Sequence, residues 1–265
     1  MMKNLFFALL FIGLFFLWFK NFEWHSIFFP TKDFAETPKV LGLNYEDIYF
    51  NTEDGLKLNA WFIPATKQQY VILFAHGNGG NISHRMSKVA MFHDLDFSLF
   101  LYDYRGYGKS EGKASEIGIY RDTNAAYNYL VKEKKIPPDK IIVYGESLGG
   151  ACAVDLAANV NVKAVILEGS FTNAKDMSKE IYPFLPAFFI MSKLDSFSKI
   201  KNIKAAKLFI HSEEDEIVPI ELAKKLYNQA LEPKAFLTIG GSHNMGVIDF
   251  EDKIKKSIVE FFNSL

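Results

Sequence analysis

Six short segments of this chain are apolar almost from end to end, and helix-like segments separate them. They cover residues 71–76, 97–104, 140–145, 162–169, 206–211 and 234–240. A strand with one face in water alternates polar and apolar residues, so runs without alternation indicate strands that are buried on both faces. Buried strands that alternate with helices build a parallel sheet with helices on each side. The pattern therefore predicts an α/β fold with a mostly parallel sheet.

Other segments complete the predicted order. Residues 43–65 are typical of two antiparallel strands that turn at Glu53-Asp54-Gly55, because Asp-Gly suits a tight hairpin. Amphipathic patterns predict helices, which cover residues 115–134, 219–231 and 250–264. The part of the chain after Pro30 contains no internal repeat and no long linker. We therefore expect a single domain over residues 31–265.

The first thirty residues have a different character. An uninterrupted apolar run over residues 5–19 lies between Lys3 and Lys20, and aromatic residues cluster at its end and beyond it. At about 1.5 Å per residue the run is short for a hydrocarbon core of roughly 30 Å, although flanking residues can extend it. Bulky residues follow where a cleaved signal peptide would have small ones. We expect residues 1–30 to be an uncleaved single-pass membrane anchor with an interfacial segment, or alternatively a hydrophobic helix packed on the domain. The flanking charges do not decide on which side of the membrane the domain would lie.

The segment GESLG (145–149) lies between the predicted strand 140–145 and an apolar, helix-like segment. In that context G-x-S-x-G predicts a nucleophile elbow, a sharp turn that places the serine side chain at the carboxyl edge of the sheet. The glycines leave space where a β-carbon would meet neighbouring backbone. The helix that begins at Leu148 directs its free N–H groups to the same place, which favours an anion there. We expect Ser147 to be a nucleophile rather than a helix-capping serine.

A serine hydroxyl needs a base within hydrogen-bond reach and an acid that orients the base. Among six histidines we favour His243, because it follows the last predicted strand in a glycine-bearing loop and so reaches the same edge of the sheet. The acidic loop 213–216 follows another strand, and from it we choose Asp215. The chain order Ser, Asp, His is the one that a nucleophile elbow of this kind requires. Glu214 and Asp249 remain alternatives for the acid.

The glycine-rich segment AHGNGGN (75–81) follows the first predicted parallel strand. We expect an oxyanion hole formed by the backbone N–H of Leu148 together with that of Asn78, or alternatively Gly79. The segment lacks the spacing of phosphate-binding loops. Cys152 is the only cysteine and is interpreted as a small buried hydrophobe. With a single cysteine, no Cys/His cluster can form a zinc site. Neither a metal nor another cofactor is expected.

Taken together, five motifs resemble the α/β-hydrolase superfamily. They are HGNGGN (76–81), DYRGYGKSEG (103–112), GESLGG (145–150), EDEIVP (214–219) and GGSHN (240–244). The resemblance covers residues 45–262 and is best to small, often membrane-tethered serine hydrolases of the serine aminopeptidase-like and acyl-protein thioesterase-like branches. It implies an eight-stranded sheet and the triad Ser147, Asp215 and His243, in agreement with the spacing. It also implies that Asp103 and Arg105 shape the loop beside the elbow.

The interval between Gly169 and Ala206 is short, which predicts a small cap insertion and an open site. Its apolar segment 181–191 is either part of the core, or alternatively a wall of an acyl pocket or a surface that rests on a bilayer.

Composition narrows the class of function. A net charge of -1 without a basic block gives no electrostatic footprint for nucleic acid. The sequence predicts a serine hydrolase that cleaves carboxylic esters or thioesters through an acyl-enzyme, on lipid-like or acylated substrates. The alternatives are a peptidase of the serine aminopeptidase type and a non-catalytic, membrane-tethered binding protein with the same fold.

Overall fold

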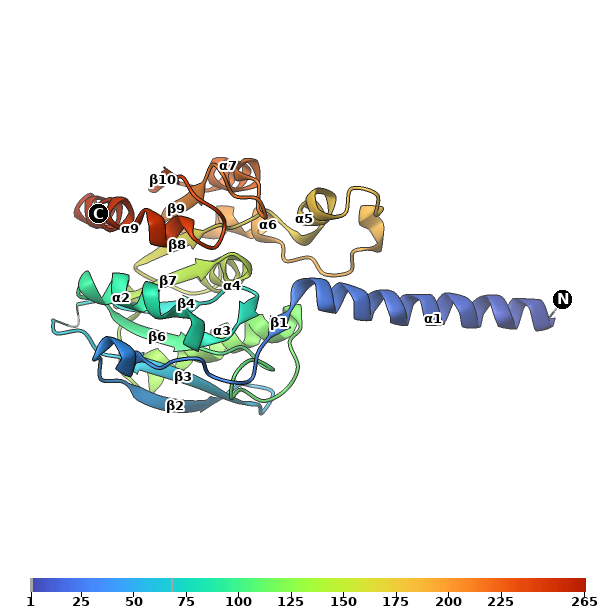
Figure 1. The fold of residues 1–265 in the computed structure, drawn as a ribbon, viewed down its shortest axis with the longest axis horizontal. Helices are drawn as coiled ribbons and strands as arrows, with labels where there is room; N and C mark the ends of the chain where they lie inside the picture. Colours follow the sequence, from blue (N-terminus) through green and yellow to red (C-terminus); the bar gives the residue numbers. More distant parts are fainter. Residues whose placement is uncertain (1, 68) are drawn as a thin grey trace.

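The computed structural model describes residues 2–67 and 69–265, and within them eight strands form one sheet (Figure 1). The spatial order is β10-β9-β8-β7-β4-β6-β3-β2. The strands are β2 (Glu46–Asn51), β3 (Lys57–Ile63), β4 (Val71–Ala75), β6 (Ser98–Tyr102), β7 (Ile141–Glu146), β8 (Ala164–Glu168), β9 (Ala206–Ser212) and β10 (Lys234–Ile239). β3 pairs antiparallel with both β2 and β6, and every other pair is parallel. The predicted α/β fold is confirmed, and each continuous apolar run contains a strand.

Helices cover both faces of the sheet. The main ones are α2 (Met86–Asp94), α3 (Glu116–Lys132), α4 (Leu148–Ala157), α7 (Ile220–Gln229) and α9 (Glu251–Asn263). Apolar side chains of α3, α4 and α7 join one buried cluster, and those of α2 and α9 join a second. Along β7, Val143 belongs to the first cluster, whereas Ile142 and Tyr144 belong to the second. The strands are thus buried on both faces, which explains why their sequences do not alternate.

The N-terminal helix α1 (Met2–Ile27) projects away from the domain over most of its length (Figure 1). Many apolar side chains of its outer part are exposed, among them Leu10, Phe11 and Leu17. Within residues 2–67 and 69–265, no helix combines the length and the hydropathy that a membrane span requires. The predicted transmembrane helix is therefore not confirmed. The last turns of α1 pack on the domain, where Phe19 is buried.

The connection from β8 to β9 is short, as the sequence predicted. It contains α5 (Ala174–Ile181), η4 (Ala187–Phe189), α6 (Ser196–Lys199) and η5 (Ile200–Asn202). Further short elements are β1 (Phe29–Pro30), η1 (Pro38–Leu41), β5 (Gly79–Gly80), η2 (Ile82–Arg85), η3 (Pro138–Lys140) and α8 (Gly246–Asp249). The segment 181–191 is not core, because Phe184 and Phe188 are exposed and several of its neighbours line a pocket.

Candidate active site

Ser147 lies at a strained turn between β7 and α4. Its φ of 51° and ψ of -112° fall in a region that residues with a β-carbon rarely adopt. A β-carbon on Gly145 would lie 2.6 Å from the Gly149 carbonyl oxygen, and one on Gly149 would collide with the backbone carbonyl of Ala75. The Ser147 N–H donates to the Glu168 carbonyl over 2.8 Å. Both glycines of the motif are therefore required by close packing, as the sequence suggested.

Asp215 and His243 form a short, buried pair. His243 Nδ1 lies 2.6 Å from Asp215 Oδ2, and the Asp215 side chain is only 2% exposed. Asp215 Oδ1 accepts hydrogen bonds from the N–H groups of Ile217 and Val218, at 2.9 and 2.7 Å. Burial alone would raise the pKa of Asp215, but the hydrogen bond and charge of His243, together with the N–H groups of Val218 and Ile217, outweigh burial and lower it. An ionised carboxylate is thus held against the imidazole, which fixes the orientation of the ring.

The other acidic candidates do not contact the imidazole. Glu214 Oε2 accepts a hydrogen bond from the Gly241 N–H at 2.7 Å, so this side chain holds the loop that carries the histidine. Glu216 Oε2 similarly accepts from the His243 N–H at 3.0 Å. Asp249 lies in α8 and makes no hydrogen bond to His243 among the described residues. Of the acids that the sequence offered, the structure brings Asp215 to the ring.

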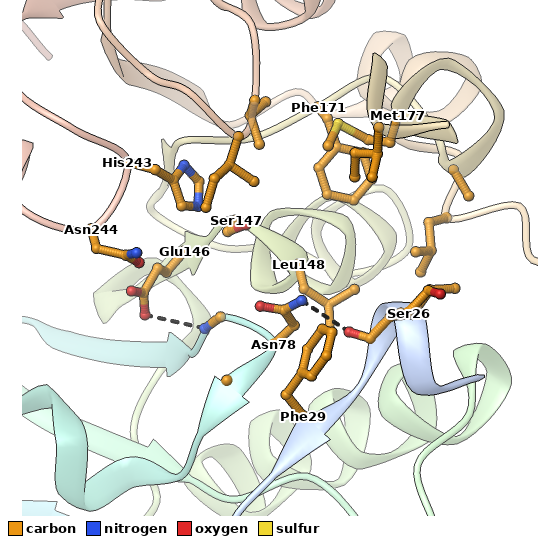
Figure 2. A pocket seen from close by; sticks show the side chains of 18 of the residues that line it. Ser26, Phe29, Asn78, Glu146, Ser147, Leu148, Phe171, Met177, His243 and Asn244 are labelled. Carbon is orange, nitrogen blue, oxygen red and sulfur yellow. Dashed lines mark hydrogen bonds between the residues drawn. The ribbon is translucent and has the colours of Figure 1, made fainter. Parts of the chain in front are cut away.

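The His243 ring lies beside Ser147 and both residues line one pocket (Figure 2). Within the described residues no hydrogen bond joins the two side chains, a contact that often tightens only when a substrate is bound. Gly169 provides the space for the ring, because a β-carbon there would lie 3.0 Å from His243 Cε1. Burial alone would lower the pKa of His243, but Asp215 outweighs burial and raises it. Sequence reasoning missed Gly169, whose one signal is a glycine directly after a strand.

The loop that bears Asn78 is held in place from several sides. The Asn78 carbonyl accepts from the Phe29 N–H at 3.0 Å and from the Tyr107 hydroxyl at 2.8 Å. Its side-chain amide donates to the Ile27 carbonyl at 3.0 Å, a bond that Figure 2 shows. Gly79, the alternative oxyanion donor, pairs with Phe29 where β5 meets β1. Leu148 is the first residue of α4, so its N–H has no partner within the helix.

A buried cluster of charges lies beside the elbow, and the sequence did not reveal it. Glu146 Oε2 accepts from the Gly77 N–H at 3.1 Å and from Arg85 Nε at 2.7 Å. Glu146 Oε1 lies 2.9 Å from Lys88 Nζ, which also reaches Glu168 Oε1 at 2.7 Å. Burial alone would raise the pKa of Glu146, but the charges of Arg85 and Lys88 lower it far below its usual range. The cluster joins β7, β8 and α2 to the start of the Asn78 loop.

Asp103 and Arg105 have structural partners. Asp103 Oδ1 accepts from the Ile82 N–H at 2.9 Å, so it supports the segment that follows the Asn78 loop. Arg105 binds Asp122 and Asp54, which lie in α3 and in the turn between β2 and β3. Arg105 therefore joins a helix to the hairpin.

A pocket of about 700 Å³ opens above Ser147. Its lining is divided in character (Figure 2): Glu146 and Asn244 lie on the His243 side of Ser147, and Phe29, Phe171 and Met177 lie on the Leu148 side. Residues of α1 and of the segment 181–191 continue the apolar side, namely Phe19, Phe22, Ile27, Ile181, Leu185 and Ile190. Among the described residues, no group of three or more metal-ligating side chains was found.

Several known proteins are similar to this chain in sequence. The model of the alpha/beta hydrolase fold family matches residues 70–191. The alpha/beta hydrolase domain-containing protein WAV2 of Arabidopsis thaliana is 37% identical over an aligned length of 219 residues, and the match covers 76% of this chain and 71% of WAV2. Protein bem46 of Schizosaccharomyces pombe is 35% identical over an aligned length of 201 residues, and the match covers 71% of this chain and 67% of bem46.

Solved structures resemble this chain in fold. The esterase Pf2001 of Pyrococcus furiosus superposes with a TM-score of 0.75 and is 20% identical, covering 89% of this chain and 98% of the esterase. The esterase EaEST of Exiguobacterium antarcticum gives a TM-score of 0.64 at 18% identity, covering 82% and 99% of the two chains. At these identities the likeness concerns the fold alone.

Proposed function

The chain belongs to the α/β-hydrolase fold family, and from that premise we propose that it is a serine hydrolase that cleaves carboxylic esters or thioesters through an acyl-enzyme. The observation that carries the proposal is the contact of 2.6 Å between Asp215 and His243 beside the strained Ser147. A structural ion pair needs no strained serine next to it. We take residues 31–265 as the catalytic domain.

The proposed mechanism assigns a role to each group. Asp215 orients the imidazole, and His243 accepts the Ser147 proton through Nε2 while the serine oxygen attacks the substrate carbonyl. The N–H groups of Leu148 and Asn78 donate hydrogen bonds to the oxyanion that forms. His243 then gives the proton to the leaving oxygen or sulfur. Water attacks the acyl-enzyme in the same way, and the acid is released.

Lipid-like or acylated substrates are supported by the apolar side of the pocket. The acidic side chains that line the pocket are already paired, which disfavours the alternative of a peptidase that recognises an amine. Glu23 Oε1 accepts from the N–H groups of Met191 and Ser192 at 3.0 and 2.8 Å. Glu146 is bound by Arg85 and Lys88.

A fluorophosphonate probe, which labels an activated serine covalently, tests the proposal. We expect the wild-type protein to be labelled and Ser147→Ala to be unlabelled. Ser87 is a matched control because it lines the same pocket but lies away from the elbow, so Ser87→Ala should be labelled normally. A folded wild-type protein that is never labelled would support the non-catalytic binding protein. Comparison of ester, thioester and amino-acid anilide turnover then separates the esterase from the peptidase.

A further inference from the structure

The last turns of α1 are built into the domain. Phe19 is 3% exposed, and its ring lies 5.6 Å from that of Phe189 in the cap. The Phe22 ring lies 5.6 Å from that of Tyr182. The Glu23 carboxylate accepts two backbone hydrogen bonds from residues 191–192. Aromatic contacts and hydrogen bonds together hold α1 against the cap at a defined position.

The chain that leaves α1 also holds the Asn78 loop. The Ile27 carbonyl accepts from Asn78, and β1 pairs with β5 so that Phe29 lies opposite Gly79. The position of α1 relative to Ser147 is thereby set through a short segment of chain. The side chains that α1 turns towards the pocket, Phe22 and Ser26 among them, lie at a defined place in it.

The direction of a bound substrate follows from the chemistry. The leaving group must lie on the His243 side of Ser147, because His243 gives it a proton. The oxyanion lies between the N–H groups of Leu148 and Asn78. The acyl chain must then extend to the opposite side, which is the side of Phe29, Phe171 and Met177 (Figure 2). That side continues between α1 and the cap, where most of the lining side chains are apolar.

We propose that the apolar side of the pocket is an acyl-binding arm of which α1 forms one wall, and that the enzyme selects esters or thioesters of long apolar acids with polar leaving groups. This rests on the proposed serine hydrolase function. Phe22 and Ser26 line the arm from α1, and Met177 and Tyr182 line it from the cap. The polar leaving group lies near Glu146 and Asn244. The N-terminal helix thus determines which acyl chain is accepted.

Esters of p-nitrophenol with acids of increasing length test the proposal, at concentrations where each ester is monomeric. Burial of one methylene favours binding about fourfold, so kcat/KM should rise by about that factor per methylene until the arm is full. Ser26→Trp fills the arm. We expect the ratio of kcat/KM for octanoate and longer esters to kcat/KM for acetate to fall more than tenfold in this variant. Asn21→Trp is the matched control on the same helix, because Asn21 is exposed and does not line the pocket.

A second variant covers the case in which Ser26→Trp does not fold, which thermal unfolding would show. Phe22→Ala widens the arm and should reduce the ratio of octanoate to acetate turnover at least fivefold. Equal chain-length profiles in wild type, Ser26→Trp and Phe22→Ala would overturn the role of α1. If the wild type were still labelled at Ser147, the proposed serine hydrolase function would stand. Loss of labelling in the wild type would instead refute the proposed function itself.

Discussion

Replacement of Glu146 by alanine removes a side chain that joins the elbow, α2 and the Asn78 loop. The carboxylate accepts from the Gly77 N–H and binds both Arg85 and Lys88. Alanine removes the acceptor of the Gly77 N–H, but both cations keep a second partner. Lys88 retains Glu168 at 2.7 Å, and Arg85 retains the Gly79 carbonyl at 2.9 Å.

The size of the effect follows from these contacts. Removal of one partner of a buried ion pair costs about 3–5 kcal/mol of stability. The Glu146 side chain is 18% exposed at the pocket and both cations keep a second partner, so the lower end of that range, about 3 kcal/mol, applies here. In a domain of this size about 1 kcal/mol shifts the melting temperature by roughly 2–4 °C, which predicts a decrease of roughly 6–12 °C.

Thermal unfolding followed by circular dichroism measures this decrease, and its pH dependence provides a second check. The native pKa of Glu146 lies below its ordinary value of 4.5, so its contribution is complete above that value and is lost as the pH falls below it. The difference between wild type and Glu146→Ala should be largest near neutral pH and should shrink towards pH ~3. A loosened Asn78 loop should also slow fluorophosphonate labelling roughly 10- to 100-fold below the melting temperature.

Glu133→Ala serves as the control, because Glu133 is exposed and follows α3 far from this cluster. A surface change of this kind should alter stability by less than about 0.5 kcal/mol. The reasoning would be refuted if Glu146→Ala melted within about 2 °C of wild type, the shift that about 0.5–1 kcal/mol produces, and was labelled at the same rate.

Three further predictions concern the site and the core. Asp215→Asn should lower kcat by about 10⁴. Asp215 raises the pKa of His243 above 6.5, and activity falls as that histidine is protonated. The acid limb of the pH profile of kcat/KM should therefore lie above pH 6.5 in wild type. It should move to lower pH in the variant. Gly149→Ala should yield little soluble protein, since its β-carbon would collide with the backbone of β4. Gly13→Ala should express normally, because the new methyl group would have no contact within 4 Å beyond its chain neighbours and the backbone of its own helix. Cys152 is fully buried, and burial raises its thiol pKa to about 12. Maleimide should therefore react with it only as fast as the protein unfolds. Rapid labelling of the native protein would contradict this.

The arrangement of strands and helices could be predicted from the sequence alone, because the pattern of burial is local. Strands such as β4, β6 and β8 are buried at every position, so their sequences are apolar except for Ser98 at the start of β6 and Glu168 at the end of β8. The place of Ser147 was also predictable, since a glycine-flanked serine between a strand and a helix has few alternative geometries. His243 and Asp215 were predictable as loop residues after strands, because the carboxyl ends of parallel strands share one edge.

Other features were decided only by tertiary structure, because they depend on residues that meet across long stretches of chain. The sequence offered Asp215, Glu214 and Asp249 as acids, and only the folded loops bring Asp215 to the imidazole of His243. Glu146 stands at a motif position where any residue is allowed, and its partner Arg85 is 61 residues away. Hydropathy marked residues 5–19 as apolar but could not show that the following turns of α1 pack on the cap and line the pocket. Local patterns report burial, whereas the identity of a contact depends on the complete fold.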